Sequence, residues 1–520
     1  MGLTAQAYDA IINILIDDKY DVHKMVLISI ALIWFIYKLI NYYWNLPPGP
    51  WGYPILGSLP ILQEPPSPDH YLEIAKDYGD IFSVTMGSTL IVCISSAKLL
   101  KEVFNRQDST GRPHTPLNNL LGGFGIVLSE GALWKKQRQF LYEKFRALGV
   151  KLCAYPRFEK YILMEIDDLS RILKEKYDGV AVDPSQLLGR HVHNVILQLM
   201  MNFRFQEHDE EFKVFNKRVN DGMNLFGSVI MGEFIKYYYE IIPGKKHIIE
   251  EVRRNLNDVS KFHTEHIEIR AKQRRAIAAR NEPADLLDYY LEAIENENEN
   301  GKNENTIFPK TDPAKQVVQV MNDLFSAGME TARTTLIWTL IILMREQEVA
   351  EKARAELKEV VNVGELVTLE LRPKLAYIEA IIFETLRRVG VVPLGTTHLN
   401  NSTWKIGDYI IPEGTRIIPL LSKMGVDPEV YPDPLKFKPE RFLKDGKLYI
   451  PDSFVQFGTG QRMCLGSQLA RMELFLFLSN LINSFDFYMP EGEPIPALKG
   501  NMGTTHSPIP FELCFKKRVE

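Results

Sequence analysis

One cysteine of this sequence stands in a setting that suits metal chemistry. Residues 457–466 read FGTGQRMCLG, and an apolar helical run follows directly. The glycines allow a tight turn, and free N–H groups with the helix dipole favour a thiolate at the amino end of a helix. Arg462 adds positive charge for an anionic ligand, and Phe457 can shield the sulfur of Cys464 from water. The loop combines five fixed positions: Phe, Gly, Arg, Cys and Gly. At average amino-acid usage they would occur together at a given start with a probability on the order of 10⁻⁷, which argues against an ordinary buried free cysteine.

A second candidate lies in the middle of an apolar helix. Residues 317–344 are apolar on nearly all faces, which predicts a buried helix. Its centre nevertheless carries Gly328, Glu330 and Thr331. A threonine hydroxyl turned onto the carbonyl of Ala327 would open the helix locally, and the adjacent carboxylate could organise water for proton delivery. The alternative is a packing glycine, with Glu330 paired to a neighbour.

The elements that position these groups are predicted to be mainly helical from about residue 70. β-Branched runs at 81–85 and 90–94 indicate a small sheet, and long helices follow through about 130–290. Thr311-Asp312-Pro313 is a start signal for the apolar helix. The polar stretch 295–305 predicts a solvated loop. Since no repeat or dividing linker appears, residues 45–520 are interpreted as one catalytic domain.

The amino-terminal part predicts a membrane anchor. After a segment at 1–24, residues 25–44 form an apolar run of the length that spans a bilayer, with aromatic residues at its end. No small-residue cleavage site follows, which argues against a signal peptide; a buried core helix is the other alternative. Residues 47–50, PPGP, then predict a stiff hinge.

Composition bounds the class of protein. The 520 residues include 61 basic and 66 acidic side chains, so the net charge of −5 argues against a nucleic-acid partner. Hydrophobic residues make up 45% and charged residues 24%, as in a folded globular chain. The four cysteines are scattered without a Cys-x-x-Cys pair, which argues against a disulfide framework or a structural zinc site. Cys93, Cys153 and Cys514 are interpreted as core thiols.

The cysteine loop resembles the haem-binding signature of the cytochromes P450, the haem-thiolate monooxygenases. The resemblance runs from the anchor and hinge to the carboxyl terminus. It includes the 327–331 turn, which is similar to the oxygen-activating stretch of the family. Glu384 and Arg387 match its Glu-x-x-Arg motif, and their spacing on one helical face makes an ion pair feasible. Arg441 matches the arginine that joins this pair in relatives.

The resemblance implies a mainly α fold with small β-sheets (α+β) and a bound haem b. Cys464 would be the axial thiolate ligand of the iron. Trp134 and Arg138 would meet one haem propionate, and Arg462 and His398 would serve the rest, although His398 has the alternative of a satisfied loop histidine. Buried carboxylates need such partners. Glu330 and Thr331 would pass protons during catalysis. The histidines outside the motifs are interpreted as structural or surface residues: His191, His193, His263 and His266.

The implied activity is insertion of one oxygen atom of O₂ into a C–H bond of a small lipophilic substrate. Electrons would come from NADPH through a cytochrome P450 reductase, because the chain has no flavin or nicotinamide motif. Lys135, Lys136 and Lys144 are candidate docking cations. The resemblance implies a single-pass protein of the endoplasmic reticulum membrane, with a cytosolic catalytic domain.

The substrate class is less specific. Stretches such as GMETARTTLIW and LKGNMGTTHSP look most like arthropod members that hydroxylate the ecdysteroid side chain. Phe325, Val392, Leu394 and the 502–507 turn are the predicted apolar lining. Three alternatives stay open: a monooxygenase of another lipophile (a juvenoid, fatty acid or foreign compound), an enzyme that isomerises or dehydrates peroxides, and a non-enzymatic haem sensor or carrier. The Glu330–Thr331 pair argues against the second.

Overall fold

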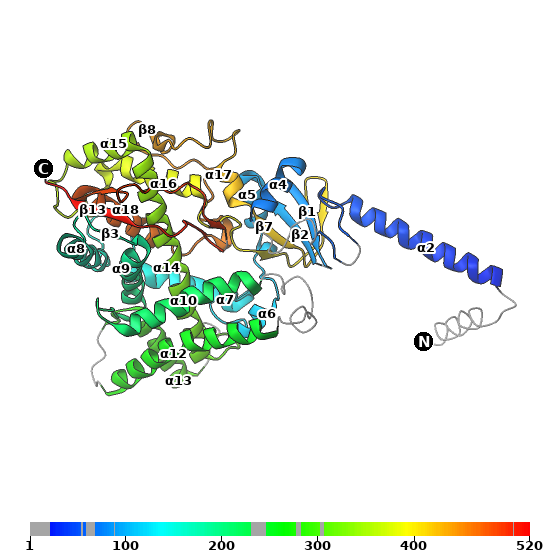
Figure 1. The fold of residues 1–520 in the computed structure, drawn as a ribbon. Helices are drawn as coiled ribbons and strands as arrows, with labels where there is room; N and C mark the ends of the chain where they lie inside the picture. The colour runs from blue at the N-terminus through cyan, green and yellow to red at the C-terminus, as the bar shows by residue number, and fades with distance from the viewer. Residues whose placement is uncertain are drawn as a thin grey trace.

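The computed structural model describes residues 21–53, 56–58, 68–87, 89–229, 246–276, 282–301, 306–502 and 504–519. Within these ranges the chain is mostly helical, with small β-sheets at the periphery (Figure 1). The mainly α architecture predicted from the sequence is therefore confirmed. The predicted segment at residues 1–24 lies almost wholly outside the described residues, as do 302–305 and 503.

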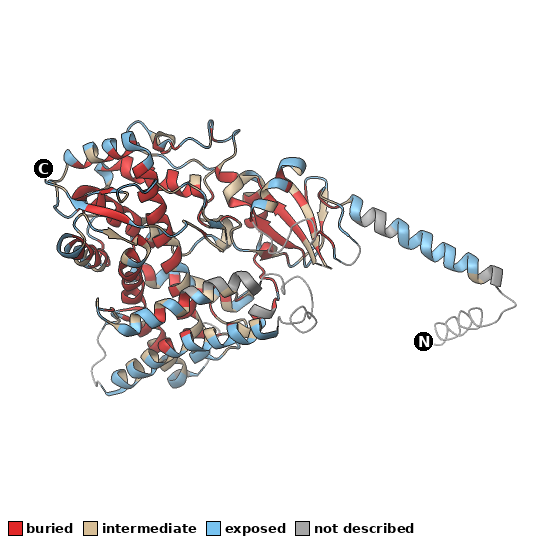
Figure 2. Cartoon of the chain, viewed as in Figure 1, coloured by how far each residue is buried: buried red, intermediate tan, exposed pale blue. Residues whose placement is uncertain are grey.

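A long buried helix forms the axis of the body. Helix α14, Pro313–Arg345, is capped by Asp312, whose carboxylate accepts hydrogen bonds from the N–H groups of Ala314 and Lys315. Its apolar surface packs against α9 (Pro184–Met201), α16 (Ala376–Val389) and α18 (Ser467–Ser484). All four helices are buried along most of their length (Figure 2). The predicted buried helix and its start signal are confirmed.

The remaining helices surround this core. They are α4 (Pro68–Tyr78), α5 (Ala97–Phe104), α6 (Pro116–Leu121), α7 (Gly131–Ala147), α8 (Glu159–Lys176), α10 (Glu210–Val229), α12 (Lys246–Ala276), α13 (Leu286–Asn300), α15 (Gln347–Lys358) and α17 (Leu421–Gly425). Helix α12 packs across both α10 and α14. Aromatic rings fill this junction, where Phe325 contacts His193, Phe215 and His263. Phe325 is completely buried among these rings, which place it in the core of the helical body.

A four-stranded sheet lies on the side of the body nearest α2. Its strand order is β1 (Ile81–Met86), β2 (Thr89–Ile94), β7 (Arg416–Pro419) and β4 (His398–Leu399). β1 and β2 form an antiparallel hairpin, and β2 pairs in parallel with β7. The two predicted strands are thus confirmed, and the sheet brings residue 398 beside residue 417.

The smaller sheets hold the carboxyl-terminal part in place. A three-stranded sheet joins β10 (Phe485–Tyr488), β13 (Leu513–Lys517) and β3 (Ala181–Val182). Three two-stranded ribbons pair β11 (Asn501–Met502) with β12 (His506–Ser507), β5 (Trp404–Ile406) with β6 (Tyr409–Ile411), and β8 (Leu443–Lys444) with β9 (Lys447–Leu448). The indole N–H of Trp338 donates to the carbonyl of His506 at 2.7 Å, which fastens the β11–β12 ribbon to α14.

Two predictions outside the candidate active site were wrong. Residues 295–300 belong to helix α13 instead of a loop, because glutamate is a good helix former and the capped apolar start at Asp285 propagates into them. Glu295 also pairs with Arg274 at 3.2 Å, so the segment has a packing role. Cys153 is exposed, since it lies in the turn after α7, whereas Cys93 and Cys514 are buried core thiols as predicted.

Helix α2, Asp21–Trp44, projects away from the body (Figure 1). Its described side chains at 25–37 are exposed and mostly apolar. Among the described residues, however, no helix meets the length and hydropathy expected of a membrane span. The hinge that follows is fastened to β1, because the N–H of Ser83 donates to the carbonyl of Pro48 at 2.8 Å and its hydroxyl donates to that of Pro47 at 2.7 Å.

Candidate active site

The loop at 457–466 forms a tight turn that presents Cys464. Its turn geometry depends on Gly460, whose φ is +70° and whose Cα lies so near the backbone of Phe104 that a Cβ would stand 2.0 Å from that carbonyl oxygen. The N–H of Cys464 donates to the carbonyl of Phe457 at 2.9 Å, which closes the loop. The Phe457 ring lies at the edge of a small aromatic cluster with Phe454.

Cys464 lies just before α18, which begins at Ser467 with Gly466 as its cap. Burial raises the pKa of the Cys464 thiol, while the N–H groups of Gly466 and Ser467 and the cation of Arg138 lower it. The net effect raises the pKa even though Cys464 is exposed at the surface, and the thiolate stays a prediction for the metal-bound protein. A metal ion would deprotonate the thiol outright.

Arg462 is fixed over the ring of Trp134. Its guanidinium carbon lies 3.9 Å from the centre of the indole ring, and its N–H groups donate to the carbonyls of Thr110, at 2.8 and 3.0 Å, and of Ser129, at 2.7 Å. Trp134 is itself buried on α7. The carbonyl of Ile126 lies 3.4 Å from the same guanidinium. Stacking and these three carbonyl acceptors therefore hold the cation in one orientation without neutralising it.

Two further guanidinium groups lie near Arg462. Arg138, one turn after Trp134 on α7, donates to the carbonyl of Met463 at 2.5 Å. Arg112 is buried and donates to the carbonyl of Thr397 at 2.9 Å. Burial and the neighbouring Arg112 lower the pKa of Arg462 to about 8, which shows how poorly the protein alone balances this charge. Arg112 was missed from the sequence because it stands in a loop with no periodic or motif partner.

His398 completes the cluster on β4. Its Nδ1 lies 2.7 Å from the carbonyl oxygen of Ser109, so this nitrogen carries the proton in the neutral ring. The ring stacks on Phe104 with centres 3.8 Å apart. Burial and Arg112 lower the pKa of His398 well below its usual value. His398 thus agrees with the alternative of a histidine whose hydrogen bond is satisfied by the protein. An anion beside Nε2 would be needed to keep a second proton on the ring.

These residues fit a haem. Burial lowers the pKa of all three clustered guanidinium groups, and these cations match the two carboxylates that a haem carries. The described carboxylate at this cluster is that of Glu130, which accepts from the backbone N–H of Arg112 and offsets only part of the lowering of the Arg112 pKa. The thiol of Cys464 beside Arg138 is a suitable axial ligand for iron.

The turn at 327–331 contains the predicted hydroxyl contact. The Thr331 hydroxyl donates to the carbonyl of Ala327 at 2.9 Å. Helix α14 nevertheless continues unbroken through this turn, so the predicted local opening is wrong. Gly328 faces α9, and a Cβ there would lie 2.7 Å from Cδ1 of Ile196. The packing-glycine alternative thus describes Gly328 correctly, because α9 and α14 approach closely at this point.

Glu330 is buried and held by its own helix and by the β11–β12 ribbon. The Arg333 guanidinium contacts one carboxylate oxygen. The hydroxyls of Thr334, Thr505 and Ser507 lie 3.2, 3.4 and 3.3 Å from the other. The Thr505 and Ser507 hydroxyls are also 3.2 Å apart. One oxygen of the carboxylate is thus surrounded by a cluster of three hydroxyl groups, which can hold or pass a proton.

The Glu-x-x-Arg pair is completely buried. Arg387 donates to both carboxylate oxygens of Glu384, at 2.6 and 2.7 Å, and to the carbonyls of Gly425 and Pro434, at 2.6 and 2.9 Å. Arg441 approaches Glu384 at 3.4 Å. The predicted three-residue arrangement is present, and it joins α16 to the chain that precedes the cysteine loop.

A second cluster of possible metal ligands has a different character. Glu165, Asp168 and His191 lie close together between α8 and α9. However, Arg204 contacts both carboxylates, and Arg190 lies 3.2 Å from Asp168. Arginine cannot coordinate a cation, and here its side chains occupy the carboxylates that a metal ion would need. The cluster is therefore an ion-pair network. His191, His193 and His263 are fully buried, in agreement with a structural interpretation.

Comparison with known proteins identifies the family. The family model for Cytochrome P450 matches residues 47–515. The chain is 37% identical over 495 residues to Cytochrome P450 18a1 of Drosophila melanogaster, which covers 94% of this chain and 90% of the relative. It is 31% identical over 492 residues to Cytochrome P450 2L1 of Panulirus argus, covering 91% of this chain and 95% of the relative. For Cytochrome P450 2E1 of Rattus norvegicus the identity is 30% over 497 residues, covering 94% and 97%. The chain therefore belongs to the cytochrome P450 family and is a haem-dependent monooxygenase.

Proposed function

We propose that this chain hydroxylates the side chain of a steroid of the ecdysteroid class. The assembly around Cys464 carries the monooxygenase part of this proposal, because a thiol and three guanidinium groups supply an axial ligand and carboxylate partners. When bound, the haem supplies the chemistry that inserts one oxygen atom of O₂ into a C–H bond. The sequence stretches that resemble arthropod ecdysteroid-hydroxylating members support the proposed class, and a Drosophila relative is 37% identical to the chain.

The protein groups would bind the haem and move protons. Arg112, Arg138 and Arg462 hold positive charge for the propionates, and the Arg462–Trp134 stack fixes its direction. The hydroxyl groups of Ser507 and Thr505, which contact the Glu330 carboxylate, would hold protons close to the turn of Thr331. Because Arg333 holds the Glu330 carboxylate, release from this contact is required before the carboxylate can turn toward another group.

Two measurements test this proposal in sequence. The carbon-monoxide difference spectrum of the reduced full chain, beside a Cys464→Ser control, should show a red-shifted Soret band that the variant lacks. Turnover with NADPH and reductase is then compared between 2-deoxyecdysteroids and a panel of fatty acids. Faster product formation from fatty acids would reject the steroid class and leave the monooxygenase standing. A thiolate spectrum without any NADPH-dependent product from a broad lipophile panel would favour a sensor or carrier.

The proposal includes attachment to the endoplasmic reticulum membrane through residues 25–44, with residues 45–520 in the cytosol. The exposed apolar side chains of α2 and the hinge fixed to β1 support attachment at this end. A chain that begins at residue 45 should leave the membrane fraction in cell fractionation, whereas the full chain should resist alkaline carbonate. Equal partition of both chains would reject α2 as the anchor.

The electron donor is proposed to be the NADPH-dependent reductase, docked on basic residues of α7. Lys135 is exposed there, whereas Lys144 is already engaged over the ring of Tyr289 at 4.7 Å. Charge reversal at Lys135 and Lys136 should therefore raise the reductase concentration needed for half-maximal turnover. Lys174→Glu, on the exposed side of α8, is the matched control. Unchanged reductase dependence in the α7 variant would remove this surface from the proposal.

A further inference from the structure

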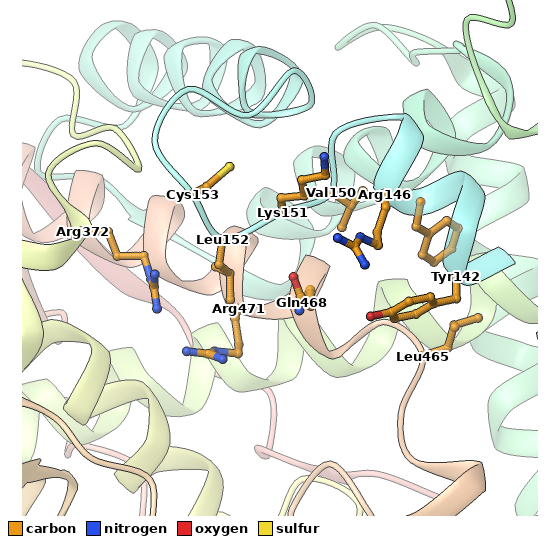
Figure 3. Close-up of a pocket in the computed structure, with 11 residues that line it drawn as sticks. Tyr142, Arg146, Val150, Lys151, Leu152, Cys153, Arg372, Leu465, Gln468 and Arg471 are labelled. Carbon is orange, nitrogen blue, oxygen red and sulfur yellow. The ribbon is translucent and has the colours of Figure 1, made fainter. Parts of the chain in front are cut away.

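A hollow of about 500 Å³ lies beside the end of α7 and the beginning of α18 (Figure 3). The turn after α7, residues 150–153, forms one wall, and Leu465, Gln468 and Arg471 form another. Arg372 lies at one edge of the hollow, on the side of Arg471 (Figure 3). A volume of this size is typical of small-molecule sites, which range from about 300 to 1,000 Å³. Its contact with Leu465 places it next to Cys464 in the chain but outside the cluster of Arg112, Arg462 and His398.

The hollow has an excess of positive charge. Its lining contains four cationic side chains and no acidic one: Arg146, Lys151, Arg372 and Arg471. Arg372 and Arg471 both pair with the same carboxylate behind the wall, that of Glu379, at 2.9 and 3.4 Å. One carboxylate cannot neutralise two guanidinium groups. The Nε atoms of both arginines are also buried without a hydrogen-bond partner among the described residues.

Apolar and cationic side chains both line the hollow. Phe145, Val150, Leu152 and Leu465 contribute apolar contacts beside these cations. Guanidinium groups match the paired oxygens of carboxylates and phosphates, whereas the apolar wall suits a hydrocarbon or aromatic body. Neither feature alone would define the ligand, but their combination selects an amphiphilic molecule with one anionic end.

We propose that this hollow binds a small amphiphilic oxyanion, a carboxylate or phosphate monoester with an apolar body, at a site separate from the haem and the oxidised substrate. This site goes beyond the proposed function and does not depend on the steroid assignment. The anionic group would lie between Arg471, Arg372 and the exposed cations Arg146 and Lys151.

Cys153 offers a reporter of occupancy, because it lines the hollow and is exposed. The holoenzyme is treated with iodoacetamide, and the alkylation rate of the Cys153 peptide is followed by mass spectrometry. The probes are decyl phosphate and decanoate below their aggregation concentrations, with decanol and inorganic phosphate as the two halves of the ligand. Cys93 and Cys514 are buried, so their peptides act as internal standards for unfolding.

The expected result is saturable protection of Cys153, at least fivefold, by decyl phosphate or decanoate, and little by decanol. Arg146→Gln with Lys151→Gln should raise the half-protecting concentration at least tenfold, since each loses a charge-assisted contact. Lys174→Gln on α8 should leave it unchanged. Equal protection by decanol, or equal protection of the double variant, would overturn the proposal. Protection by reductase but by none of the small anions would overturn it as well and assign the hollow to a protein interface.

Discussion

The buried pair of Glu384 and Arg387 gives the sharpest prediction for stability. Glu384→Gln keeps the size of the side chain and removes its charge. Both residues are fully buried, and Glu384 accepts two hydrogen bonds from Arg387 and a third from the N–H of Lys438 at 2.8 Å. After the substitution, the glutamine amide oxygen can replace at most one of the two carboxylate acceptors. The Arg387 guanidinium keeps the carbonyls of Gly425 and Pro434 but stays buried without its counter-ion.

The expected loss of unfolding free energy is about 3–5 kcal/mol, the usual cost of removing one partner from a buried ion pair. Unfolding entropy is about 2 cal/mol/K per residue, so a domain of this size should lose about 3–5 °C in Tm. Glu440→Gln is the matched control from the same segment, 439–442. Its salt bridge to Lys352 is 2.8 Å long but solvent-exposed, and such pairs contribute about 1 kcal/mol or less.

The assay is thermal unfolding of the full chain at a fixed scan rate, because unfolding of a large cofactor protein is rarely reversible. The amplitude of the reduced carbon-monoxide band gives the fraction of protein that retains thiolate-ligated haem. Glu384→Gln should lower both quantities, and Glu440→Gln should leave them close to the parent values. Equal shifts in the two variants would refute the reasoning, because burial would then not decide what the ion pair contributes.

Three further predictions concern other parts of the fold. Burial lowers the pKa of His263 from 6.5 to about 4, so the unfolded chain binds this proton first and stability should fall as pH drops from 6.5 to 4. The loss of unfolding free energy should reach about 3 kcal/mol. His263→Gln should flatten the dependence of Tm on pH, and a variant curve parallel to that of the parent protein would contradict this. Gly49→Ala would place a Cβ 1.8 Å from the carbonyl oxygen of Ser83, so it should lower Tm by displacing the hinge from β1; an unchanged Tm would count against that contact. Trp338→Phe removes the 2.7 Å hydrogen bond to the carbonyl of His506, so hydrogen exchange in the β11–β12 ribbon should accelerate about tenfold, a loss of about 1.4 kcal/mol; unchanged exchange would show that the bond does not hold the ribbon.

Local signals in the sequence predicted the elements that carry the chemistry. Asp312 and Pro313 mark the start of α14, and the β-branched runs at 81–85 and 90–94 mark two strands, because capping and β propensity act over a few residues. The same reasoning failed at 295–300, where polar composition suggested a loop. There a helix started by apolar residues extends through Glu295, which pairs with Arg274 of α12.

The cationic cluster shows the limit for the site. Arg462 and Trp134 could be selected by motif and by resemblance, but their stacking joins residues more than 300 positions apart. Arg112 had no signal at all, because its importance comes only from the loop that buries it beside Arg462. His398 was selected with the correct neighbours, yet its protonation depends on burial and on Arg112, neither of which is visible in the chain.

The cysteine loop, the buried helix with its acid and hydroxyl, and the spacing of Glu384 and Arg387 can be read from local sequence, since each depends on residues that are close along the chain. The groups that surround these residues become known only when the folded chain is seen. Glu330 is held by Arg333 and by two hydroxyls from the β11–β12 ribbon, and the pKa of Cys464 is raised by burial despite the helix end beside it. Desolvation and long-range pairing arise when distant segments pack, and a local pattern contains neither.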